Sequence, residues 1–263
     1  MLFTNITYIG IDPTAGKTPF TYSALDSDLR LLVLGQADMD EVLAFVAGQK
    51  AAFVAVCAPR RPNLGKMLDP KVRDALTPQP NPGRWTNFRV AEYLLRQANI
   101  NIHQTCADKS DCQNWMQVGF KLYSRLEKIG YEDFKSGNSE HQMTEVYPHA
   151  SYTSLLGIIP FAKHSLEGRL QRQLILYENG INLPDPMRFF EEITKHRLLC
   201  GILPDEELSS PSELDALTAS LTAWMAVNKP GKSCLIGDAE EGQILLPTPS
   251  LKGKYYKQCH VSN

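Results

Sequence analysis

Three acidic residues stand where their carboxylates could do chemistry. Asp12 ends the apolar segment "YIGID", and Glu145 lies in the short segment "TEVYP". Asp215 lies in the first turns of a helical pattern whose small residues would let the helix press closely on a sheet. Carboxylates that converge from strand ends and one helix can hold one or two Mg²⁺ ions, because hard cations prefer oxygen ligands. Two such ions ~4 Å apart can activate water for phosphodiester cleavage.

The stretch around Asp12, "YIGIDPTAGKTPF", also contains a Gly-Lys-Thr sequence that suggests a phosphate-binding loop. That motif needs four residues between its first glycine and the Gly-Lys pair, whereas five separate Gly10 from Gly16. The motif must also deliver its lysine to the start of a helix, but Pro19 follows and the next segment is typical of a strand. We therefore interpret the segment as a turn between two strands, with Lys17 as a phosphate contact on that turn.

The elements around these acids predict an α/β domain with a mixed sheet. β-Branched and aromatic residues indicate three strands linked by short loops, which is typical of an antiparallel meander. An amphipathic helix with Asp38 as its N-cap follows, and then an apolar run typical of a strand buried on both faces. These segments are 5–12, 20–26 and 30–36 for the meander, 39–49 for the helix and 51–59 for the buried strand.

Helical patterns dominate the chain after a proline-rich loop, "TPQPNPG", at 77–83. The clearest helix is predicted over 209–228. Ser210 can cap it, Pro211 suits its first position, and Glu213 completes a capping box. The other expected elements are helices at about 88–98, 114–129, 166–178 and 187–199, a short strand at 144–150 that ends at Pro148, and a hairpin at 233–247.

The bulk composition is ordinary for a globular protein, with 43% hydrophobic and 21% charged residues in 263. No run of 18 apolar residues occurs, so we expect no membrane span. The first residues lack the basic start and apolar centre of a signal peptide. Six cysteines without a C-x-x-C pair indicate reduced thiols, and we expect a cytoplasmic protein.

Two segments of the chain are locally basic. The net charge of −2 argues against a surface coated in phosphate-binding groups. Residues 60–89 contain seven Lys or Arg against two acids, and 252–257 contain three lysines and two tyrosines. Such segments suit a polyanion, although solvated surface charge is the alternative reading. The arginines of the first segment that we expect to contact a nucleic-acid substrate are Arg60, Arg61 and Arg89.

Five motifs in order along the chain resemble the DUF429 family of predicted nucleases with a ribonuclease H-like fold. They run from about residue 7 to 247 and read "YIGID", "VAVCAP", "EVYPHA", "ELDALTASLTAW" and "EEGQILLP". The resemblance implies a single domain over 1–263 with a helical insertion at roughly 80–140. Its core would be a mixed five-stranded sheet in which the first three strands are antiparallel, with helices on both faces.

The resemblance also implies a divalent-metal site. Asp12 matches the acid of the family's first strand, Glu145 the acid of its "E-x-YP" motif, and Asp215 the acid of its terminal helix. These three would be the catalytic residues and the ligands of Mg²⁺ or Mn²⁺. Arg89 and Glu92 resemble the family's central pair of an arginine and an acid.

One position departs from the family pattern. The buried strand typically ends in an aspartate before Ala-Pro, whereas this chain has Cys57. A thiol is a poor ligand for Mg²⁺, which prefers oxygen. Two main hypotheses follow: a divalent-metal-dependent nuclease that hydrolyses phosphodiester bonds, or a disarmed nucleic-acid or nucleotide-binding protein of the same fold. An unrelated small-molecule enzyme is supported only by the near-neutral charge.

Overall fold

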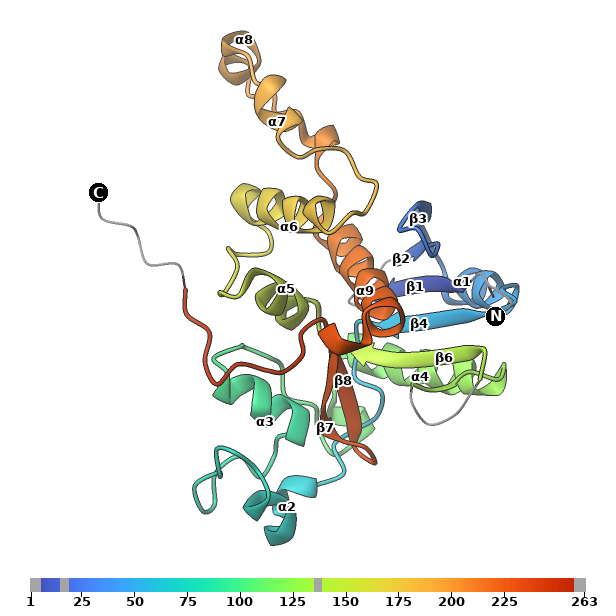
Figure 1. Cartoon of the computed structure of the whole chain (residues 1–263), viewed down its shortest axis with the longest axis vertical. Helices are drawn as coiled ribbons and strands as arrows, with labels where there is room; N and C mark the ends of the chain where they lie inside the picture. The colour runs from blue at the N-terminus through green and yellow to red at the C-terminus, as the bar shows by residue number, and fades with distance from the viewer. Residues whose placement is uncertain (1–5, 15–18, 135–138, 258–263) are drawn as a thin grey trace.

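The computed structural model of the chain describes residues 6–14, 19–134 and 139–257 (Figure 1). The strands are β1 Thr7–Asp12, β2 Phe20–Leu25, β3 Leu31–Ala37, β4 Ala52–Val56, β5 Glu132–Asp133, β6 His141–Val146, β7 Cys234–Asp238 and β8 Gly242–Leu246. The helices are α1 Met39–Ala47, α2 Pro70–Asp74, α3 Val90–Gln97, α4 Asn114–Lys128, α5 Pro148–Leu156, α6 Leu166–Glu178, α7 Arg188–Glu191, α8 Lys195–Leu199 and α9 Pro211–Asn228. None of the helices in these ranges is both long and apolar enough to cross a membrane.

The strands form one mixed sheet in the order β3-β2-β1-β4-β6-β8-β7, with β5 paired to β6. The predicted antiparallel meander is confirmed, since β1 pairs with β2 and β2 with β3 in antiparallel fashion. β4 and β6 then join in parallel. The sheet has eight strands in the described residues rather than the five expected. The reason is that the far edge of β6 accepts both β5 and the β7–β8 hairpin.

The predicted helix starts at Asp38 and Ser210 are confirmed, because both residues complete capping boxes. Pro148 was expected only to end a strand. It also opens α5 at the first helical position, where a proline loses no hydrogen bond. The helical pattern at 187–199 is divided into α7 and α8, and Thr194 caps the second of them.

Residues 80–140, where a helical insertion was expected, contain α3 and α4 as their main helices. These two helices pack in different places. Ala91 and Leu95 of α3 contact the β7–β8 hairpin, whereas Leu122 and Leu126 of α4 lie in the core with β1 and β4. Arg89, the residue before α3, is thereby held against β6 and β8.

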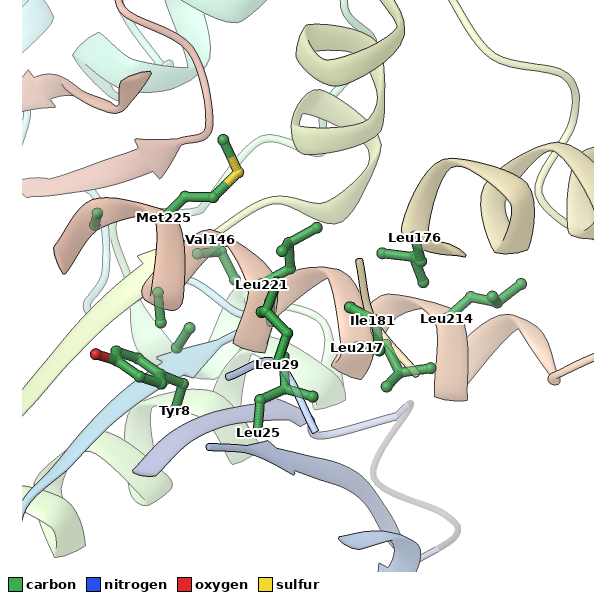
Figure 2. Close-up of a cluster of buried hydrophobic side chains, with 14 of the residues drawn as sticks. Tyr8, Leu25, Leu29, Val146, Leu176, Ile181, Leu214, Leu217, Leu221 and Met225 are labelled. Carbon is green, nitrogen blue, oxygen red and sulfur yellow. The ribbon is translucent and has the colours of Figure 1, made fainter. Parts of the chain in front are cut away.

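Helix α9 covers the opposite face of the sheet from α1 and α4 (Figure 1). Figure 2 shows Leu25 and Leu29 lying under α9, toward its Leu217 and Leu221. The predicted small-residue side of α9 is confirmed as the side that packs on the strands. Its backbone comes so close to Gly10 that a Cβ there would lie 1.9 Å from the Ala216 carbonyl oxygen.

Gly10→Ala is therefore expected to destabilise the protein by at least about 3 kcal/mol, because neither β1 nor the α9 backbone can move without unpacking the core. Gly35→Ala is the matched control on the same sheet. The nearest atom to a Cβ at Gly35 is a Tyr22 ring carbon at 3.9 Å, which is an ordinary contact. Urea unfolding of both variants measures the difference, and equal stabilities would contradict the close approach of α9 to β1.

Candidate functional site

The register of three strands decides which acids can meet. Ile11 of β1, Val56 of β4 and Glu145 of β6 are neighbours in register. Register neighbours point to the same face of a sheet, and Ile11 and Val56 lie in the core against α1 and α4. Asp12 and Cys57 are each one residue further along. They therefore face α9, whereas Glu145 faces the other side.

On the α9 side, the carboxyl ends of β1 and β4 open into a pocket of about 590 Å³. The first turn of α5, the loop between α5 and α6, and the start of α9 complete its walls. We call it the acid pocket. Its ionisable lining residues include Asp12, Cys57, His149, Lys163, Arg172 and Asp215, and its aromatic walls include His103, Trp115, Tyr147 and Phe161.

Asp12 and Asp215 form the acidic centre of the pocket. Burial and the charge of Asp215 raise the pKa of Asp12 to about 6, even though the Thr14 backbone N–H and Ser212 donate hydrogen bonds to it. Asp215 is only 8% exposed, and burial raises its pKa as well. Two largely desolvated carboxylates that repel each other are stabilised by a cation beside them.

Lys163 supplies a positive charge beside these acids in the described structure. Its ammonium group forms an ion pair with the Asp215 carboxylate. Burial lowers the pKa of Lys163, but Asp215 and Asp12 outweigh burial and raise it above the ordinary value. The lysine comes from the loop between α5 and α6, which Arg172 anchors by donating to the Phe161 carbonyl at 2.9 Å. One lysine thus balances part of the charge of two acids.

Cys57 directly follows β4 and lies close to the two acids as a neutral thiol. Burial raises its pKa well above the ordinary value, and the charges of Asp12 and Asp215 raise it further. Its Sγ lies 3.6 Å from the backbone carbonyl oxygen of Asp215, to which the thiol donates. A protonated thiol is a poor nucleophile and a poor metal ligand, so Cys57 gives the pocket no negative charge.

His149, on the first turn of α5, brings a neutral imidazole to the same pocket. Burial lowers its pKa to about 4, and the nearby charges of Arg172 and Lys163 act in the same direction. At neutral pH the ring is therefore uncharged, and one ring nitrogen can accept a hydrogen bond.

Glu145 belongs to a separate, buried network. It accepts hydrogen bonds from Arg89 Nη1 at 2.9 Å, from Arg89 Nη2 at 2.6 Å and from the Arg60 backbone N–H at 2.9 Å. Arg89 also donates to Glu92, which in turn accepts from Thr105. Of the three acids singled out from the sequence, the structure thus brings Asp12 and Asp215 together and engages Glu145 elsewhere.

The basic residues expected to contact a substrate are largely engaged with acids. Arg60 pairs with Glu127 at 2.8 Å and with Asp133 at 2.9 Å. Arg89 is 1% exposed within its carboxylate network. Burial raises the pKa of Asp133, and the nearby charges of Arg60 and Arg61 act in the opposite direction. The proposed turn at Gly16, with Lys17, lies outside the described residues.

Sequence reasoning missed Lys163, Arg172 and Ser212. Lys163 sits in a loop with no motif around it, and nothing in its local pattern indicates a partner 52 residues away. Ser212 lies in the first turn of α9, where its role as a hydrogen-bond donor to Asp12 depends on how the helix docks. Only the docked structure could identify these residues.

The raised pKa of Asp12 predicts a pH-dependent loss of stability. The unfolded chain releases this proton near pH 4 and the folded protein only near pH 6, so stability falls as the pH rises through this window. Asp12→Asn does not titrate. It is therefore expected to be more stable than the wild type by about 1–3 kcal/mol at pH 7.5 and about equal near pH 3, below the unfolded pKa. Urea unfolding at both pH values measures this, and an Asn variant less stable at pH 7.5 would contradict it.

Fold and site together define a mixed α/β protein with a two-carboxylate pocket at the carboxyl ends of its central strands. A family model described as "Protein of unknown function (DUF429)" matches residues 10–241. The chain belongs to the DUF429 family. The matched range includes Asp12, Cys57, Glu145 and Asp215. The sequence matches no curated protein and no solved structure.

Proposed function

We propose that this protein is a divalent-metal-dependent phosphodiesterase that acts on nucleic acid, with a ribonuclease H-like core. The observation that carries the proposal is the pair of carboxylates formed by half-buried Asp12, at the carboxyl end of β1, and buried Asp215 of α9. The fold part is supported by the strand order β3-β2-β1-β4-β6, with antiparallel pairing first and parallel pairing after it.

The donor set suits one cation better than two. Among the described residues, no three His, Cys, Asp or Glu side chains lie together in a way that could hold a metal. Mg²⁺ is commonly bound through one or two carboxylates plus substrate phosphates and water, and Asp12 with Asp215 meets that minimum. Lys163 would release Asp215 when the cation arrives. A bound ion would supply charge neutralisation at the phosphate and a more acidic water.

The other side chains of the pocket have roles that follow from their charge states. Neutral His149 can accept a hydrogen bond from a water molecule in the pocket, although its low pKa makes it a weak base. Lys163, once free of Asp215, can contact the substrate phosphate as a point charge from its loop. Ser212 orients the Asp12 carboxylate by its hydrogen bond.

The test is cleavage of single-stranded, double-stranded and hybrid oligonucleotides in Mg²⁺ or Mn²⁺, with EDTA and the Asp12→Asn variant as controls. We expect metal-dependent cleavage by the wild type and loss of at least about 100-fold in the variant, because it removes one of two charged ligands. Cleavage by wild type that never exceeds the variant would contradict the proposal.

Cys57 favours a second candidate, a disarmed nucleic-acid or nucleotide-binding protein of the same fold. Its thiol is protonated where the family pattern has a carboxylate, and the single lysine already balances part of the remaining charge. Binding of the same oligonucleotides without cleavage in any metal would support this candidate over the first.

A further inference from the structure

The acid pocket has aromatic walls that the phosphodiester chemistry does not use. Trp115 meets His103 edge-on, with ring centroids 6.0 Å apart, and its Nε1 donates to Gln113 at 2.7 Å. Tyr147 donates from its hydroxyl to the Asn101 carbonyl at 2.7 Å. These rings are held by hydrogen bonds before any ligand arrives, so a flat ligand would find its stacking surfaces in place.

Phe161 stands at the mouth of the same pocket with its ring 45% exposed. Its backbone is fixed on both sides, since its N–H donates to Gln171 at 2.9 Å and its carbonyl accepts from Arg172 at 2.9 Å. The ring is therefore carried by an anchored stretch of backbone, two residues before Lys163. An aromatic surface and a cation side by side match a base and its phosphate.

Size and charge limit how much of a nucleic acid can bind. A volume of about 590 Å³ is in the range of pockets that enclose one small molecule of nucleotide size. Outside the pocket, Arg60 and Arg89 are committed to carboxylates and cannot line a phosphate track. Among the described residues that line the pocket, Lys163 and Arg172 are the only Lys or Arg side chains, which favours contact with one phosphate inside it over contact with many.

From this we infer that the acid pocket takes a single unpaired nucleotide, either a free nucleotide or the end of a single strand, and not the interior of a duplex. The base stacks among Trp115, His103 and Phe161, and the phosphate lies at the Lys163 ammonium group. The inference rests on the function proposed above for the identity of the ligand, but it concerns binding and strand state.

The experiment measures equilibrium binding in Ca²⁺ and again in EDTA, so turnover is not needed. The ligands are a nucleoside 5′-monophosphate, a single-stranded octamer and a closed dumbbell duplex of the same sequence. We expect the first two to bind at least tenfold more tightly than the dumbbell. A plot of the logarithm of the octamer association constant against the logarithm of salt concentration should have a slope of about −0.7, which corresponds to one neutralised phosphate. Equal affinity of monophosphate and octamer identifies the free nucleotide, and tighter octamer binding identifies the strand end.

Phe161→Ala and Trp115→Ala test the stacking surfaces. Each is expected to weaken monophosphate or octamer binding about 5- to 150-fold, which corresponds to one lost base–aromatic contact. Phe190→Ala is the control, since Phe190 is also exposed, at 53%, but lies far from the pocket in α7. Helices α7 and α8 form an arm that extends away from the sheet (Figure 1). Phe161 is exposed, so its variant should fold even if the Trp115 variant does not.

The inference is overturned if the dumbbell binds as tightly as the octamer, if the salt slope indicates several phosphates, if Phe161→Ala binds like Phe190→Ala, or if no ligand binds. Its failure is distinguishable from failure of the proposed function. If a single nucleotide binds but no metal supports cleavage, only the proposed phosphodiesterase activity is contradicted. If duplexes bind tightly and are cleaved with metal, only the inference about the unpaired nucleotide is contradicted.

Discussion

Cys57→Asp is expected to tighten Mn²⁺ binding about 10- to 100-fold and to raise the rate of metal-dependent cleavage, because it adds a third oxygen ligand to the acid pair. Cys57 follows β4 as Asp12 ends β1, and the Cys57 backbone N–H donates to the Ile11 carbonyl at 2.8 Å. The two side chains therefore share the face of the sheet that α9 covers. Asp215 approaches the same place from α9, with its backbone carbonyl 3.6 Å from the Cys57 sulfur.

The same substitution should carry a stability signature. Without metal, a third buried carboxylate adds repulsion to a pair whose pKa values burial already raises, so the variant should unfold at lower urea than the wild type. Mn²⁺ should restore more stability to the variant than to the wild type, because ligands that bind only the folded state stabilise it by mass action. Calorimetric titration and urea unfolding with and without Mn²⁺ measure both effects.

Cys57→Asn is the matched control, since it has the shape of aspartate without the charge. We expect it to leave Mn²⁺ affinity within about threefold of the wild type. If the Asp and Asn variants bind Mn²⁺ equally, then position 57 does not face the cation, and the placement of the site between β1, β4 and α9 is wrong.

Arg89→Met is expected to destabilise the protein by about 3–5 kcal/mol, the cost of leaving buried carboxylates without their partner. Arg89 is 1% exposed, and it holds both oxygens of Glu145 as well as Glu92. Its positive charge is itself strongly favoured, because the two acids overcome the burial that would lower its pKa. Water could reach these groups only if the contact between α3 and the β7–β8 hairpin opened.

The matched control for this substitution is Arg60→Met, in which the same chemical change is made beside half-exposed acids. Arg60 pairs with Glu127 and Asp133, whose side chains are 51% and 41% exposed. Water can solvate those carboxylates, so we expect a loss of about 1 kcal/mol or less. Urea unfolding compares the two variants. Similar losses would show that the Arg89 network is no more protected from solvent than the Arg60 pairs.

Local patterns in the sequence predicted the elements that depend on local rules. The meander, the capped starts of α1 and α9, and the small-residue side of α9 all follow from periodicity and capping within a few residues. The strand count did not, because the two-residue β5 carries no pattern and nothing local indicates that the predicted hairpin joins the edge of β6. Pro148 was read as the end of a strand, although the same residue favours the first turn of a helix.

The candidate site was only partly predictable for a related reason. Asp12 and Asp215 could be paired from a strand end and a helix face, but the side of the sheet that Glu145 faces depends on register. A shift of one residue reverses that side, and no local pattern near Glu145 fixes it. Lys163 and Arg60 have partners 52 and 67 residues away, so their engagement with acids is a property of the packed chain.

The close approach of α9 to Gly10 also determines when the site can exist during synthesis. Asp12 belongs to the first strand and Asp215 to a helix about two hundred positions later, and the two acids meet only after that helix has docked on the strand. Loop closure over such a separation comes late among folding events. A nascent chain would therefore emerge from the ribosome without the paired acids of the acid pocket, and would gain that pair only when α9 is in place.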